Sequence, residues 1–199
     1  KGLGECFRTT FTKGKGTIVA FESYQKDDVD FSAIITKVAL KKPDLIFLPD
    51  YYNKVALIAR QIREKGIRST LLGGDGWDSP DLLKIGGSAI TGGYFVNHYS
   101  PDRKDPVADA FIRKYKARHG IIPDAFAALA YDAAVILLKA LDAAKKPVSG
   151  EILKTLASTK NYKGVTGLIS FDAKGDAIKS AVILKVDKTG YTYVTTVNP

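Results

Sequence analysis

The sequence predicts an α/β protein built around a doubly wound parallel sheet. Over residues 1–97, short apolar runs with the length of buried strands alternate with longer stretches in which apolar residues recur at helical spacing. Helices that separate consecutive strands are typical of parallel βαβ units. The first half of the chain is therefore expected to form a compact sheet of about four strands, flanked by helices.

The predicted elements of this half follow a regular order. A helix over residues 2–12 precedes a strand over 17–23, and a helix over 30–41 follows. The next strand, 45–48, leads into a helix that starts at Asn53 and ends near Gly66. The remaining elements are a strand at 69–72, a short helix at 81–85 introduced by Ser79 and Pro80, and a strand at 93–97.

The pattern changes after residue 98. Three helices, at 106–119, 125–144 and about 150–157, follow one another without an intervening strand. Each has an apolar face that needs a further layer to cover it, and no strand in this stretch is available to provide one. Strand patterns return at the end of the chain, at 167–171 and in a hairpin formed by 181–186 and 191–197.

Composition excludes several classes of function. The net charge is +9, but the lysines are scattered and are not interleaved with aromatic residues, which argues against a nucleic-acid-binding surface. The single cysteine, Cys6, lies at roughly helical spacing among apolar residues and is expected to be a small buried side chain. The chain has no methionine, so residue 1 is not an uncleaved translation start, and we expect a removed signal peptide or a missing N-terminal piece.

No catalytic or metal-binding pattern is present in the sequence. His98 and His119 stand alone, without a second ligand at metal spacing, and Ser32 and Ser79 have no histidine nearby. The glycine patterns of dinucleotide-binding turns and of serine hydrolases are missing. We therefore expect no metal, no cofactor and no enzymatic activity.

Two loops carry the most informative chemistry. Residues 49–53 follow the strand at 45–48, and residues 73–79 follow the strand at 69–72. In parallel α/β sheets such loops meet at the carboxyl ends of the strands, where ligands bind. The second loop places the carboxylate of Asp75 among glycines, and both loops supply aromatic rings. This combination is typical of a site that binds a small ammonium compound.

Structural alternatives stay open for each of these residues at this point. Asp75 is also suited to bind its own backbone in a turn. Tyr51 could be a half-exposed loop aromatic, Trp77 a lid over the strand ends, and Phe126 a core residue at the start of a helix.

Five motifs occur in a fixed order and span nearly the whole chain, at residues 30–33, 43–52, 72–80, 124–133 and 164–172. Together they resemble the branched-chain amino-acid-binding proteins, which are extracytoplasmic receptors of ABC importers with the type I periplasmic-binding fold. Five ordered motifs make this resemblance far more specific than any one of them would.

The resemblance implies two α/β lobes that close like a hinge over an amino acid. Residues 1–98 would form the main part of lobe two, a nearly complete doubly wound sheet. Residues 99–163 would supply helices of an incomplete lobe one, and 164–199 return strands that belong mainly to lobe two. The amino-terminal half of lobe one has no counterpart here, and the helices would pack on its sheet.

The same resemblance assigns roles to individual residues. Asp75 would hold the α-ammonium group, Tyr51 would lie against the ligand, and Phe126 would reach into the cleft from lobe one. Tyr52 and Trp77 are placed near the site by adjacency only.

The leading functional hypothesis is thus a receptor that delivers an amino acid, branched-chain or otherwise aliphatic, to a membrane permease. If lobe one is truncated, its bare apolar surface should promote self-association. One alternative is a sensory ligand-binding domain of the same fold for amides or small carboxylates. Another is a flavodoxin-like enzyme or receiver in which Asp75 is the reactive carboxylate.

Overall fold

The computed structural model describes residues 2–144 and 148–199 and confirms the α/β class. By its internal contacts the chain divides into two compact units. The first unit contains the chain up to Val96 together with Lys185–Thr192, and the second contains Asn97–Leu184 and Tyr193–Pro199.

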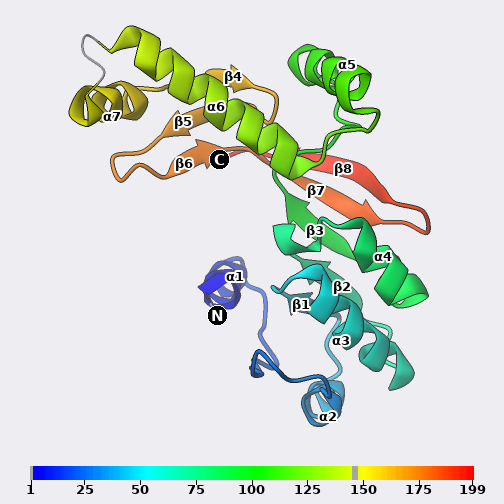
Figure 1. Ribbon diagram of the computed structural model, residues 1–199. Helices are drawn as coiled ribbons and strands as arrows, with labels where there is room; N and C mark the ends of the chain where they lie inside the picture. The colour runs from blue at the N-terminus through cyan, green and yellow to red at the C-terminus, as the bar shows by residue number, and fades with distance from the viewer. Residues whose placement is uncertain (1, 145–147) are drawn as a thin grey trace. The chain divides into compact units, whose positions relative to one another are not determined.

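A five-stranded mixed sheet with a parallel core contains the strands of the first unit (Figure 1). Of its last two strands, only Lys185–Val186 and Tyr191–Thr192 belong to that unit, and the remaining residues belong to the second. Its strands lie in the order β1-β2-β3-β7-β8, and the last two form the predicted hairpin. Their bounds are β1 (Leu45–Leu48), β2 (Thr70–Gly73), β3 (Tyr94–Asn97), β7 (Ala181–Val186) and β8 (Tyr191–Val197).

The register of the parallel strands fixes where their following loops lie. Leu48, the last residue of β1, pairs with Gly73, the last residue of β2, and Gly73 pairs in turn with Phe95 of β3. Strands β1 and β2 therefore end side by side, and the loops after them start from the same edge of the sheet.

Helices cover both faces of this parallel core. In Figure 1, α1 lies on one side of β1 and β2, while α3 and α4 lie on the other. The ring of Phe7 on α1 stacks on Phe47 of β1, with ring centroids 4.2 Å apart. The helical elements of the unit are α1 (Gly2–Lys13), α2 (Ser32–Leu40), α3 (Tyr52–Glu64), α4 (Pro80–Gly86) and the short 3₁₀ turns η1 (Asp75–Trp77) and η2 (Gly87–Ala89).

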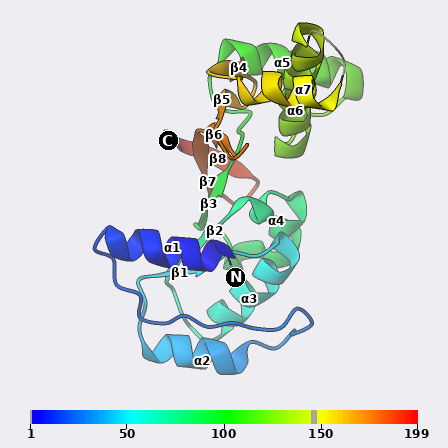
Figure 2. The ribbon, with the colours of Figure 1, turned by 90° about the vertical axis from the view of Figure 1, so that its left-hand side faces the viewer.

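The predicted strand at 17–23 is wrong. Residues 16–25 contain no regular secondary structure, and Figure 2 shows them as part of the long connection between α1 and α2. Side chains hold this segment in place, because Tyr24 bonds to Asp50 and Glu22 lies 3.8 Å from the ammonium group of Lys37. The run of four apolar residues at 18–21 suits a strand, but here it is only partly buried and forms no backbone ladder.

The predicted burial of Cys6 is also wrong, because this residue is exposed. Helix α1 turns its Gly4, Phe7 and Phe11 side inward. Cys6 is about 100° around the helix from Phe7 and therefore points away from that packed face.

The second unit contains the three consecutive helices that the sequence predicts, and in addition a small antiparallel sheet. Only its central strand was predicted, because the outer two have three residues each and show no alternation to detect. The helices are α5 (Pro106–His119), α6 (Ala125–Ala143) and α7 (Ser149–Ala157), and the sheet, in the order β4-β5-β6, consists of β4 (Tyr162–Gly164), β5 (Gly167–Phe171) and β6 (Ala177–Lys179).

A buried carboxylate joins α6 to this sheet. Asp132, only 1% exposed, accepts hydrogen bonds from the backbone N–H groups of Val165 and Thr166, both at 2.8 Å. The hydroxyl of Thr166 adds a third, at 2.7 Å. A methyl group on Gly164 would lie 2.5 Å from the same carboxylate, so the approach requires glycine there.

We expect Asp132→Ala to lower the free energy of unfolding by about 3 kcal/mol, because it leaves buried N–H donors without an acceptor. Urea denaturation followed by circular dichroism would measure the change. Asp142→Ala, an exposed position on the same helix, is the matched control and should alter stability by no more than about 0.5 kcal/mol. Equal effects of the two substitutions would contradict the structural role of Asp132.

Candidate functional site

The two loops singled out in the sequence are in direct contact. A methyl group added to Gly76, in the loop after β2, would lie 2.9 Å from the carbonyl oxygen of Asp50 and 3.3 Å from the Cα atom of Tyr51, in the loop after β1. Only a residue without a side chain allows this approach. The backbone of Gly76 thus brings the neighbours Asp75 and Tyr51 to the same edge of the sheet.

Asp75 opens the 3₁₀ turn η1 and is exposed to solvent. The turn is closed by backbone bonds from the N–H of Trp77 to Gly74 and from the N–H of Asp78 to Asp75. The exposed side chain of Asp75 stands at the carboxyl end of β2, where the topology of the sheet places ligand sites. A carboxylate in this position can accept hydrogen bonds from a cationic ligand.

Trp77 is fully buried and fixes the same turn to the sheet. Its indole N–H donates to the carbonyl oxygen of Leu48, at 3.0 Å, and its ring fills the space above Gly73, where a methyl group would lie 2.0 Å from the indole. The ring also packs against Phe95, with centroids 6.0 Å apart. Contact between Trp77 and a ligand stays a prediction, and complete burial of the ring favours an indirect role through the position of Asp75.

A second anchor for this loop comes from β8. The hydroxyl of Tyr191 donates to the carbonyl oxygens of Trp77 and Ser79, and its ring meets Phe95 edge to face at 5.0 Å. Burial raises the pKa of Tyr191 to about 12, so the hydroxyl stays protonated as a donor at neutral pH. The sequence gives no signal for this contact, which joins positions more than a hundred residues apart.

Tyr51 and Tyr52 lie where the other loop enters α3. Tyr51 is the residue that precedes the first turn, has an extended backbone and is 68% exposed. Tyr52 is the first helical residue and is half-buried. The two side chains therefore differ in exposure, because most of Tyr51 is open to solvent while Tyr52 is partly covered by protein.

Asp50 and Tyr24 were not identified from the sequence, yet they hold this loop. One oxygen of the Asp50 carboxylate accepts the N–H of Tyr51 at 2.7 Å, and the other accepts the hydroxyl of Tyr24, also at 2.7 Å. Burial, together with the bond to Asp50, raises the pKa of Tyr24 far above its ordinary value and keeps it a donor. Adjacency to Tyr51 could have pointed to Asp50, but no sequence signal points to Tyr24.

Phe126 belongs to the second unit. It is the second residue of α6 and is 70% exposed. Asp124 starts this helix by accepting the N–H of Ala127 at 2.8 Å. Phe126 therefore lies in the first turn of a capped helix and is open to solvent. It is not a core residue, which was the alternative considered from the sequence.

A comparison with protein families identifies the group to which this chain belongs. The model of one family, the periplasmic binding proteins, matches residues 2–191. The chain is a member of that family. Because its members are binding proteins, the expectation of a non-enzymatic protein is confirmed.

Relatives in the family are named for branched-chain amino acids. The chain is 29% identical over 177 residues to the Leu/Ile/Val-binding protein homolog 3 of Brucella melitensis, and 30% identical over 181 residues to the Leu/Ile/Val-binding protein BraC3 of Rhizobium johnstonii. Each alignment covers 88% of this chain and 48% of the relative. The chain thus spans about half the length of these curated relatives.

Solved structures confirm the periplasmic-binding-protein fold. The leucine-binding protein LivK of Thermotoga maritima superimposes with a TM-score of 0.93 at 37% identity, over 100% of this chain and 57% of LivK. LivJ of Streptococcus pneumoniae, solved in complex with isoleucine, gives a TM-score of 0.84 at 34% identity, over 98% of this chain and 56% of LivJ.

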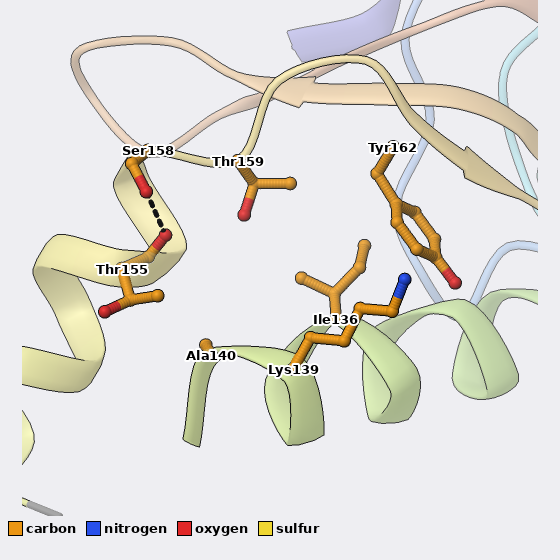
Figure 3. A pocket seen from close by; sticks show the side chains of 7 residues that line it. All are labelled: Ile136, Lys139, Ala140, Thr155, Ser158, Thr159 and Tyr162. Carbon is orange, nitrogen blue, oxygen red and sulfur yellow. Dashed lines mark hydrogen bonds between the residues drawn. The ribbon is translucent and has the colours of Figure 1, made fainter. Parts of the chain in front are cut away.

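An open pocket of about 180 Å³ in the second unit is a weaker candidate than the loops (Figure 3). Several of its polar groups serve the protein itself. Ser158 donates to the carbonyl oxygen of Thr155 at 2.7 Å, and the ammonium group of Lys139 lies 4.8 Å from the ring centre of Tyr162. No predicted site residue is among those that line it, which are Ile136, Lys139, Ala140, Thr155, Ser158, Thr159 and Tyr162.

A charged cluster in the same unit is structural. Lys179 donates to the hydroxyl of Thr166 at 2.9 Å, beside the carboxylate of Asp132. Burial lowers the pKa of Lys179 to about 8, and nearby Arg103 adds to this effect while Asp132 opposes it.

Within residues 2–144 and 148–199, no group of three or more His, Cys, Asp or Glu residues could hold a metal ion. In those same ranges, no helix has the length and apolar character needed to cross a membrane.

The contact at Gly76 can be tested by adding one methyl group. We expect Gly76→Ala to lower the free energy of unfolding by about 1–3 kcal/mol, because the new Cβ overlaps the backbone of the neighbouring loop. Gly74→Ala is the control, since its Cβ would meet only a side-chain atom of Leu3, at an ordinary 3.9 Å. Thermal unfolding of both variants measures the difference, and equal tolerance of the two would contradict the contact.

Proposed function

We propose that the protein is the solute receptor of an ABC import system and binds an amino acid, branched-chain or otherwise aliphatic. The observation that carries this proposal is the exposed carboxylate of Asp75 at the carboxyl end of β2, on a loop that touches the loop of Tyr51. The names of the relatives support it, since LivK is called a leucine-binding protein and LivJ was solved with isoleucine.

The chemistry of the site suits the ammonium end of an amino acid. A charge-assisted hydrogen bond from the ammonium group to Asp75 would contribute about 1.5–3 kcal/mol. The exposed ring of Tyr51, with Tyr52 beside it, would add about 0.5–2 kcal/mol by cation–π attraction. Trp77 supports Asp75 from below, and Phe126 would contribute apolar contact from the other lobe.

In this proposal the two units correspond to the two lobes of a hinged receptor. The first unit would be lobe two and the second would be the helical part of lobe one, and the lobe limits predicted from the sequence stay a prediction. An amino acid that contacts both lobes would stabilise the closed form, which the membrane permease recognises. The receptor would work outside the cytoplasm after removal of a signal peptide.

The first experiment is a calorimetric titration of the intact receptor with leucine, isoleucine and valine, repeated for Asp75→Asn. We expect the affinity to fall about 10- to 150-fold, because the amide keeps the shape of the side chain but loses the charge that pairs with the ammonium group. Asp27→Asn, an exposed carboxylate elsewhere in the first unit, should leave the affinity unchanged.

Other results would redirect the proposal. An unchanged affinity in Asp75→Asn would remove Asp75 from the site. Binding of amides or small carboxylates in place of amino acids would favour the sensory domain over the import receptor.

We also propose that this chain, on its own, associates with a second copy through α6. The helix is apolar on nearly all sides, but only the face formed by Ala125, Ala128, Asp132, Ile136 and Ala140 is buried. On its other sides, Leu138 is 59% exposed and Leu137 is 45% exposed. A helix that is apolar all round is normally covered on every side, and a large bare apolar face is typical of an interface.

Sedimentation velocity of this chain tests the proposed association. We expect a concentration-dependent dimer that Leu138→Lys shifts towards the monomer by at least about tenfold in dissociation constant, since a buried charge costs more than 1.4 kcal/mol. Leu40→Lys changes an even more exposed leucine on α2 and should have no effect. A monomer at all concentrations would contradict the role of α6 as an interface.

A further inference from the structure

A series of contacts in the first unit connects α3, through the segment before α2 and then Tyr24, to the loop that precedes α3 itself. In the first of these contacts, two side chains of α3 hold the segment that precedes α2. Gln61 accepts the N–H of Phe31 and donates to the carbonyl oxygen of Val29, both at 2.8 Å. Lys54 donates to the carbonyl oxygen of Asp28 at 2.6 Å.

Tyr24 is fixed by the segment that α3 holds. Its half-buried ring meets Phe31 edge to face, with centroids 5.1 Å apart, and Phe31 itself is only 2% exposed. The buried ring of Phe31 thus helps to fix the position of the Tyr24 hydroxyl. Its raised pKa, caused by burial and by the neighbouring carboxylate of Asp50, keeps the proton on this hydroxyl.

Asp50 makes the last contact of the series, between Tyr24 and the start of α3. Its backbone N–H bonds to the carbonyl oxygen of Leu48 at 3.0 Å, which turns the chain sharply at the end of β1. Its carboxylate receives Tyr24 on one oxygen and the N–H of Tyr51 on the other. The negative charge also lies at the N-terminal end of α3, where the helix dipole favours it.

This arrangement matters because little else determines where the Tyr51 ring points. With 68% of Tyr51 exposed, packing does little to orient the side chain. The direction of its Cα–Cβ bond is instead set by the backbone, which Asp50 holds on the N–H side. On the other side, the carbonyl oxygen of Tyr51 accepts the N–H of Val55 at 3.0 Å in the first turn of α3.

We propose that Tyr24 and Asp50 are positioning residues that hold Tyr51 in its ligand-contacting orientation. This inference rests on the proposed function. Each oxygen of Asp50 accepts a hydrogen bond from the protein, so we assign Asp50 to holding the loop, and Asp75 remains the proposed partner of the ammonium group. Substitution of Tyr24 therefore acts on ligand binding only through Tyr51.

The first part of the test needs no ligand. Tyr24→Phe keeps the ring on Phe31 and removes only the hydroxyl, so we expect the fold to persist. Exchange of the Tyr51 amide hydrogen, followed by NMR, should become about tenfold faster, and more in Asp50→Ala, which removes both acceptors. Tyr193→Phe, which removes a hydroxyl bonded to Thr196 on β8, should leave this exchange unchanged. Unchanged exchange in Tyr24→Phe would overturn the inference, whatever the protein binds.

The second part is a double-mutant cycle on leucine affinity in the intact receptor. We expect Tyr24→Phe to weaken binding about five- to tenfold in the parent protein and to have no effect in the Tyr51→Ala background. Additive losses would show that Tyr24 acts elsewhere and would overturn the inference. A parent receptor that binds no amino acid would instead refute the proposed function, while amide exchange still decides whether Tyr24 holds Tyr51.

Discussion

The close approach of two loops at the carboxyl ends of β1 and β2 is the constraint on which the candidate site depends. The parallel register ends both strands together, but register alone leaves several ångströms between the following loops. Gly76 removes that gap, because its backbone contacts Asp50 and Tyr51 directly. Trp77, buried beneath the turn, keeps the second loop from lifting away from the sheet. An exposed carboxylate and an exposed aromatic ring can share one surface only because the backbones beneath them are in contact.

The two units solve different packing problems. In the first, helices cover both faces of a parallel sheet, so apolar burial is nearly complete around Leu71, Val55 and Phe95. In the second, a small antiparallel sheet covers one face of α6, and the buried carboxylate of Asp132 provides the connection. A fully bonded carboxylate gives direction to a contact that apolar packing would leave loose. Helices α5 and α7 also contact α6, and the exposed side chains of Leu137 and Leu138 mark the part of the helix where we propose that a second copy binds.

Much of the fold could be predicted from the sequence, because most elements of the first unit carry strong local periodicity. The strand at 45–48 and the helix after it are examples, and the final hairpin, most of which belongs to the second unit, was predicted as well. The failures share a physical cause, which is that pairing is not local. Residues 17–23 contain an apolar run typical of a strand but form no ladder, while β4 and β6 form ladders although they have only three residues each. For the site, loop chemistry pointed to Asp75 and Tyr51, but nothing local could reveal that Tyr24 and Tyr191 support them.

These distant supports explain how the backbone at an exposed candidate site can be well defined. A side chain with most of its surface in water loses conformational entropy when a ligand fixes it, and that loss weakens binding. Supports that fix the backbone in advance reduce the loss without covering the surface that the ligand needs. Tyr191 does this for the loop of Asp75 by donating to the carbonyl oxygens of Trp77 and Ser79, and Tyr24 does it for Tyr51 through Asp50. Both act as neutral donors because burial raises their pKa, so the support stays constant over the pH range in which an amino acid carries its ammonium charge.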